Sequence, residues 1–166
     1  MDTFKYHASP EWHMSFVDFA VYAVHLLFGG VWTGSVVFVT VAVLPTAREG
    51  LANAEPLAPV VGKLRNISRV SAVVMLLTGG HMAGAAAGYT VESLTGTTRG
   101  YLVLAMVALW FVLIGLVEVG GGKLADGFEE MKVREPAREA RPLFLAATVV
   151  SLLLLLDAGL LAGGIT

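Results

Sequence analysis

The sequence predicts an all-α integral membrane protein that folds as a four-helix bundle. Of the 166 residues, 56% are hydrophobic and only 14% are charged, whereas soluble domains carry about 25% charged residues. The apolar residues form four runs of about 20 residues, the length that crosses a hydrocarbon core of about 30 Å. Continuous runs favour helices, because a membrane β-barrel shows alternating segments of about ten residues. We therefore expect a single membrane domain over residues 1–166.

The expected spans cover about 14–44, 70–89, 101–119 and 142–163. Pro45 is expected to end the first span, since proline lacks the backbone N–H that a helix interior needs. Gly120-Gly121-Gly122 is expected to stop the third span. The polar stretches 46–58 and 123–141 are predicted to be solvated connections, the second partly helical.

The distribution of lysine and arginine predicts the orientation. The first and third connections, with the basic start of the second span, hold nine of the 11 basic residues, and the other side holds Lys5 and Arg99. Basic residues stay on the cytoplasmic side of a membrane. We therefore expect a multi-pass protein of the cell (plasma) membrane with both termini outside.

Composition also excludes several classes of function. The chain has no cysteine, which excludes disulfides, thiolate metal sites, iron–sulfur clusters and covalently attached c-type haem. A net charge of −2 leaves no basic face for nucleic acid. No nucleophile elbow, Walker loop or His-Glu-x-x-His helix is present, so electron transfer or transport is favoured over enzymatic catalysis.

Ionisable residues inside the spans are the main candidates for function, because they are costly in a membrane. His25, His81 and Asp157 lie on three different spans, each about 12 to 14 Å below the outer edge at 1.5 Å per residue. Glu118, near the inner end of the third span, is expected to pair with Arg69.

Two imidazoles at one depth on different helices are typical of axial ligands of a haem iron. We therefore predict a haem b ligated by His25 and His81. Gly29, Trp32 and Gly84 share faces with these histidines and would make room for the macrocycle, and Arg99 would meet its propionates. Asp157 would hydrogen-bond a ligating histidine, carry a proton or ligate a metal.

Two alternatives remain open. Copper would use His25 and His81 with the neighbouring His13, Met14 and Met82, because Cu(I) prefers soft ligands. Alternatively, Gly30-x-x-x-Gly34 and Gly80-x-x-x-Gly84 serve only helix packing. The chain would then be a cofactor-free subunit of a membrane complex. Beyond the lipid bilayer, a redox partner, another membrane subunit or a second copy of the chain is expected as a partner.

Two motifs carry a resemblance to known families. The first motif is His25-x6-Trp32-x-Gly34, and the second is the basic entry 64–69 followed by an apolar run that ends in Thr78-Gly79. Together they resemble the CopD-like (copper resistance protein D) membrane family, which implies a four-helix unit associated with copper uptake or tolerance. The first-helix histidine is also similar to that of the membrane protoporphyrinogen oxidase-like haem proteins, which implies that His25 is a haem b ligand. The third span here begins Gly100-Tyr101-Leu102 and has no lysine before Lys123, unlike that group.

Overall fold

The structure, a computed structural model, describes residues 15–164, which are helical with short connections and contain no strand. The elements in chain order are α1 (Phe16–Phe38), the π-helical turn η1 (Val39–Val43), α2 (Leu44–Glu49), α3 (Ala54–His81), the π-helical turn η2 (Met82–Ala86), α4 (Val91–Gly96), α5 (Thr98–Glu129) and α6 (Arg134–Gly163). The all-helical prediction is therefore confirmed for the described residues.

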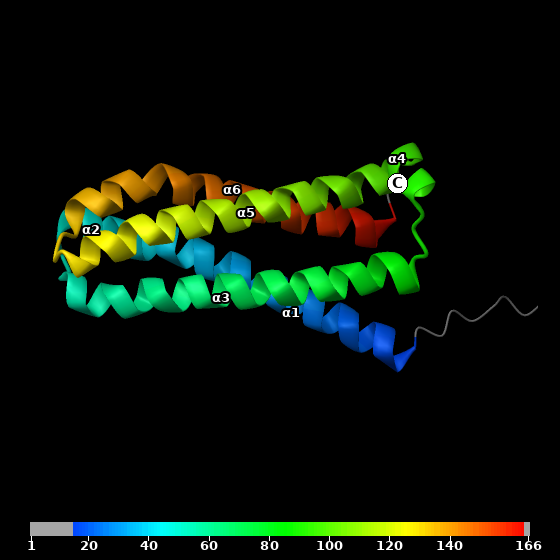
Figure 1. Cartoon of the computed structure of the whole chain (residues 1–166), viewed down its shortest axis with the longest axis horizontal. Coiled ribbons are helices and arrows are strands. Elements are labelled where there is room, and N and C mark those ends of the chain that lie inside the picture. The colour runs from blue at the N-terminus through cyan, green and yellow to red at the C-terminus, as the bar shows by residue number, and fades with distance from the viewer. Residues whose placement is uncertain (1–14, 165–166) are drawn as a thin grey trace, which may run out of the picture.

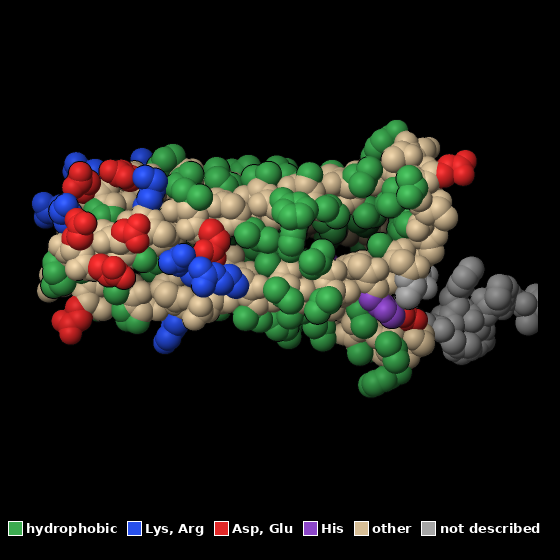
Figure 2. Space-filling view, in the orientation of Figure 1, with side chains coloured by type: hydrophobic (Ala, Val, Ile, Leu, Met, Phe, Trp, Pro, Cys, Tyr) green, Lys and Arg blue, Asp and Glu red, His purple; other side chains and the backbone are tan. Residues whose placement is uncertain are grey.

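The long helices α1, α3, α5 and α6 run along the long axis of the molecule (Figure 1). Helix α3 packs against α1 and α5, and α6 packs against α5 and α1. We call the end with α2 and the α5–α6 turn the charged end, because charged side chains gather there (Figure 2). The opposite end, where α1 begins and α6 stops, is the terminal end.

Three helical segments of the described chain are long and apolar enough to cross a membrane. They are Phe16–Glu49, Thr98–Glu129 and Arg134–Gly163. Helix α3 is long enough at 28 residues, but it carries Glu55, Lys63, Arg65 and Arg69 before its apolar segment begins at Val70. The prediction of a membrane protein is thus supported by three helices.

The predicted end of the first span at Pro45 is wrong. The helix continues through η1 and α2 and ends at Gly50, which adopts a left-handed conformation (φ 71°). Within η1 the backbone shifts to i→i+5 hydrogen bonding, as when Leu44 N–H donates to Val39 O. The hydroxyl of Thr46 donates to the carbonyl of Ala42 (2.8 Å). The wider turn and this side-chain donor let the helix tolerate a residue without an N–H.

The start of the first span agrees with the expectation of about residue 14 to within two residues. Helix α1 begins at Phe16, where Ser15 is the N-cap and accepts a hydrogen bond from the backbone N–H of Asp18. The Ser15 hydroxyl in turn donates to the Asp18 carboxylate (2.6 Å).

The predicted stop at Gly120-Gly121-Gly122 is also wrong, because α5 runs through the three glycines to Glu129. A Cβ at Gly120 would lie 3.0 Å from the Phe144 ring of α6, and one at Gly121 would lie 2.9 Å from Arg65 of α3. These glycines bring neighbouring helices close together. The energy of that packing outweighs the low helix propensity of glycine.

The connections are shorter than predicted. Helix α3 begins at Ala54 and includes Pro59, and α6 begins at Arg134 and includes Pro142. Residues 123–129 belong to α5, so four residues, 130–133, connect α5 to α6. The second span was expected to reach about residue 89, and the helix ends slightly earlier, because α3 continues as η2 only to Ala86.

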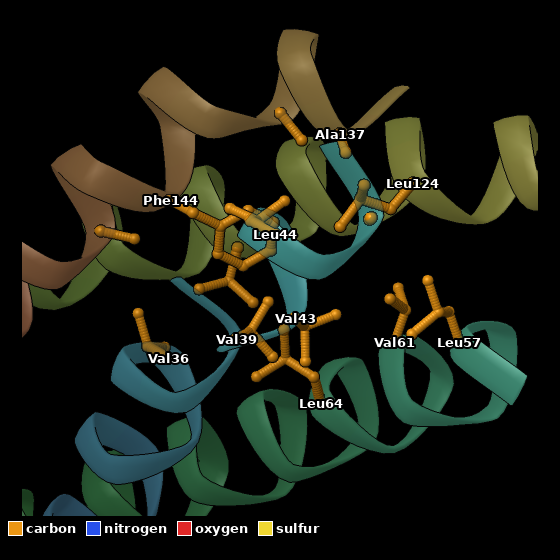
Figure 3. Packing of buried hydrophobic residues seen from close by; sticks show 14 of the residues in the cluster. Val36, Val39, Val43, Leu44, Leu57, Val61, Leu64, Leu124, Ala137 and Phe144 are labelled. Carbon is orange, nitrogen blue, oxygen red and sulfur yellow. The ribbon is translucent and has the colours of Figure 1, made fainter. Parts of the chain in front are cut away.

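The buried apolar core lies mainly toward the charged end. Figure 3 shows side chains of α1, η1, α2, α3, α5 and α6 meeting there around Leu44 and Phe144. On α1 the buried apolar residues start at Trp32, and on α5 at Leu113. Closer to the terminal end, the helices bury few apolar side chains against one another, and this leaves room for the site described next.

Candidate functional site

His25 is held by Thr78 in a single orientation. Its Nδ1 lies 2.7 Å from the Thr78 hydroxyl oxygen, and that hydroxyl is 2.7 Å from the carbonyl of Val74. The hydroxyl has one proton, which it donates to the carbonyl, so it accepts the proton of Nδ1. This assigns the Nδ1–H tautomer and leaves a free lone pair on Nε2.

His25 borders an apolar cavity between the four long helices. The cavity has a volume of about 220 Å³ and is lined almost entirely by carbon and sulfur atoms. The lining residues that matter for chemistry are His25, Gly29, Trp32, Met75, Gly79, Gly80, Met106 and Trp110. An imidazole with a free lone pair at an apolar cavity is suited to bind a metal ion. It is equally suited to bind an apolar cofactor that contains a metal ion.

Glycines create part of this space. A Cβ at Gly79 would lie 3.3 Å from Cε1 of His25, and one at Gly29 would lie 3.7 Å from the sulfur of Met75. At Gly80 a Cβ would meet nothing within 4 Å, because this residue faces open space. Larger residues at positions 79 and 80 would press on the imidazole or fill the cavity.

Two methionines on the cavity were missed by the sequence reasoning. Met75 of α3 and Met106 of α5 both line it. Their thioethers are soft metal ligands. The signal was available for Met75, which lies three residues before Thr78 and so shares its helix face. For Met106 no local pattern indicated the direction of the side chain.

His81 is engaged with Asp18 and is not among the residues that line the cavity. Its Nε2 lies 3.1 Å from a carboxylate oxygen of Asp18. Because the carboxylate accepts, Nε2 of His81 carries a proton, whereas Nε2 of His25 carries none. The structure thus places the two predicted ligands on adjacent helices but orients them toward different partners.

Asp157 is buried (7% exposed), and neither of its carboxylate oxygens hydrogen-bonds a described residue. It precedes Ala158, which lines the cavity. The predicted hydrogen bond from Asp157 to a histidine is not formed, since Thr78 occupies Nδ1 of His25 and Asp18 occupies Nε2 of His81.

The other predicted site residues divide between the cavity and the surface. Gly29 and Trp32 line the cavity, as expected for a binding site. Gly84 is exposed, and Arg99 donates a hydrogen bond to the carbonyl of Leu161 (3.1 Å). Met82 begins η2, while His13 and Met14 lie outside the described residues.

The packing alternative for the glycines gains no support within the described chain. A Cβ at Gly30, Gly34, Gly80 or Gly84 would meet nothing within 4 Å, so these residues do not mediate close contact between its helices. Among residues 15–164, no group of three or more histidine and carboxylate side chains is placed to hold a metal. A metal at the cavity would therefore depend on one imidazole and thioethers.

No protein-family model matches this chain, and neither a curated protein nor a solved structure gave a match. The resemblance to the CopD-like and protoporphyrinogen oxidase-like families stays a prediction from the motifs quoted above.

Proposed function

We propose that this chain is an integral membrane protein that binds a haem b beside His25 and serves electron transfer or redox sensing. The observation that supports this is the free lone pair of His25 Nε2 at an apolar cavity, with the ring held through Nδ1 by Thr78. A histidine that ligates a metal donates its other N–H to an oxygen acceptor in this way. Bound haem would supply one-electron chemistry.

The residues around the cavity suit a haem if the side chains of Met75 and Met106 move. A volume of about 220 Å³ is below the range of roughly 300–1,000 Å³ typical of ligand sites. Met75 and Met106 occupy part of the surrounding space, and methionine side chains change rotamer easily. Haem binding therefore requires these side chains to move, and it benefits from the absence of side chains at Gly79 and Gly80.

The second axial ligand has candidates from both sequence and structure. His81 would need to release Asp18 and turn toward the cavity, whereas Met75 and Met106 already line it. We favour a thioether as the second ligand for this reason. Bis-histidine ligation predicts that His81→Ala abolishes the low-spin spectrum, and thioether ligation predicts that Met75→Leu or Met106→Leu does so.

Copper binding is the second candidate function. One imidazole and two thioethers at one apolar cavity form a donor set that Cu(I) prefers. This donor set keeps His25 from the copper site expected from sequence. It uses Met75 and Met106 in place of the other expected ligands. It fits the copper association that the CopD-like resemblance implies.

We further propose that all four long helices cross the membrane. Helix α3 would cross between α1 and α5 with its apolar segment from Val70 onward, continued by η2 to Ala86. The start of α1 and the end of α6 lie at the same end of the molecule (Figure 1), as four crossings require. The basic charged end would then face the cytoplasm of a cell membrane.

Purification in detergent from haem-supplemented cells tests these functions together. The haem proposal predicts a Soret band with sharp reduced α and β bands, and about one iron per chain by elemental analysis. Bound copper with a colourless protein would support the second function. A preparation that binds neither haem nor Cu(I) when each is added would contradict both.

A further inference from the structure

A cluster of two arginines and one glutamate joins α3 to α5 and has no role in the proposed cofactor site. Arg69 donates to both carboxylate oxygens of Glu118, each at 2.8 Å. Arg65 donates to one of them at 3.1 Å. With two positive charges and one negative, we call this the Arg-Glu cluster, and its net charge is positive.

The cluster has hydrogen-bond donors left over. Each guanidinium carries five N–H groups, of which Arg65 uses one and Arg69 uses two for Glu118. Nε of Arg65 is buried, so the donors of Arg65 that remain for a ligand are those of its two terminal nitrogens. The side chain of Arg69 is 55% exposed and that of Arg65 is 29% exposed. Glu118 fixes the two guanidinium groups side by side, so their outward N–H groups form a preorganised site for an anion with several oxygens.

The surface next to the cluster is apolar. In the direction of the terminal end, Val73 and Leu76 of α3 follow Arg69 on the same helix face. On α5, Phe111 and Val107 share the face of Glu118. All four apolar side chains are exposed in the monomer. Gly115 lies between Glu118 and Phe111, and a Cβ there would meet nothing within 4 Å.

We propose that the Arg-Glu cluster binds the phosphate of an anionic phospholipid, with an acyl chain lying along this apolar strip between α3 and α5. Basic pockets between membrane helices bind lipid headgroups in this way. A free phosphate would gain nothing from the strip, whereas a lipid uses both features at once. The Arg-Glu cluster itself is separate from the proposed cofactor site, because neither its arginines nor Glu118 line the cavity, although Leu76 and Val107 of the strip do.

Native mass spectrometry of the purified full chain in a neutral detergent tests the proposal. The probes are dioleoylphosphatidylglycerol, dioleoylphosphatidylcholine and inorganic phosphate. We expect one phosphatidylglycerol to be retained in preference to phosphatidylcholine. Arg69→Gln should weaken its binding roughly fivefold, since each basic residue near the headgroup contributes on the order of 1 kcal/mol. Arg65→Gln should weaken it as well, because it removes the second guanidinium of the cluster.

The matched control is Lys132→Gln, which removes one positive charge from the α5–α6 turn, where Lys132 pairs with Glu130. This variant should retain phosphatidylglycerol as the wild type does. Three results would overturn the proposal: equal retention of both lipids, equal weakening by the control, or displacement of phosphatidylglycerol by millimolar inorganic phosphate. If Arg69→Gln does not fold, Arg65→Gln decides in its place, because unchanged binding of phosphatidylglycerol contradicts the proposal.

Discussion

The chemistry of the proposed site depends on one side-chain pair, His25 and Thr78. The hydroxyl of Thr78 sets which nitrogen of His25 is free, because its own proton is committed to the carbonyl of Val74. The sequence indicated His25 through its position in an apolar span, and it placed Thr78 only as part of a Thr-Gly motif. Their pairing depends on the rotation of two helices about their axes, which a single sequence does not determine.

Thr78→Val should leave the fold intact and weaken haem binding. Valine has the shape of threonine but accepts no hydrogen bond, so the imidazole loses the partner that orients it. Losing such an outer partner lowers metal affinity roughly 10- to 100-fold, and losing one interhelical hydrogen bond in a membrane costs about 0.6 kcal/mol of unfolding free energy. Haem titration and thermal unfolding measure the two effects.

Thr78→Ser is the control, because serine keeps the hydroxyl. It should bind haem with an affinity close to that of the wild type. Equal loss in the serine and valine variants would mean that the methyl group of Thr78, rather than its hydroxyl, matters to the site.

At the scale of elements, α5 is shaped by glycines that the sequence suggested would break it. A Cβ at Gly127 would overlap Pro136 of α6, whereas a Cβ at Gly122 would meet nothing within 4 Å. Both glycines lie inside the same helix. Their local sequence gives no reason to distinguish them, because the difference arises from which face meets a neighbour.

Gly127→Ala should therefore destabilise the protein, since α5 and α6 would have to separate near their connecting turn. Gly122→Ala should stabilise it by about 1 kcal/mol, the difference in helix propensity between alanine and glycine. Thermal unfolding in detergent, followed by circular dichroism, measures both. Stabilisation by both alanines would show that α5 and α6 do not pack closely at Gly127.

The end of the first helix was also not predictable from its local sequence. Proline is a strong stop signal in a sequence, yet Pro45 lies within a helical segment that runs from Phe16 to Glu49. The π-helical turn before it and the hydroxyl of Thr46 compensate locally. The existence of the long helices was predictable from apolar runs, and their ends were not.

At the scale of the molecule, the helices pack tightly toward the charged end and leave a cavity toward the terminal end. The sequence placed His25, Gly29 and Trp32 on one helix face through their spacing, and the structure shows all three lining the same cavity. It did not predict that His81 turns to Asp18 or that Met75 and Met106 face the cavity. These directions follow from how the four helices pack together.

The proposed topology can be tested with single cysteines, since the chain has none of its own. Glu92→Cys lies in α4 at the terminal end, and Lys132→Cys lies at the charged end. A membrane-impermeant maleimide should label the first variant in intact cells and the second only after permeabilisation. The opposite pattern would reverse the orientation, and labelling of both in intact cells would contradict four crossings.

The central claim is that Nε2 of His25 ligates a haem, and titration of haem into the purified protein tests it most directly. The wild type should bind one haem per chain and give the Soret band of a ligated iron. His25→Ala should lose this spectrum while keeping the helical content and the thermal unfolding of a folded protein. A folded His25→Ala variant with the haem spectrum and affinity of the wild type would contradict the account.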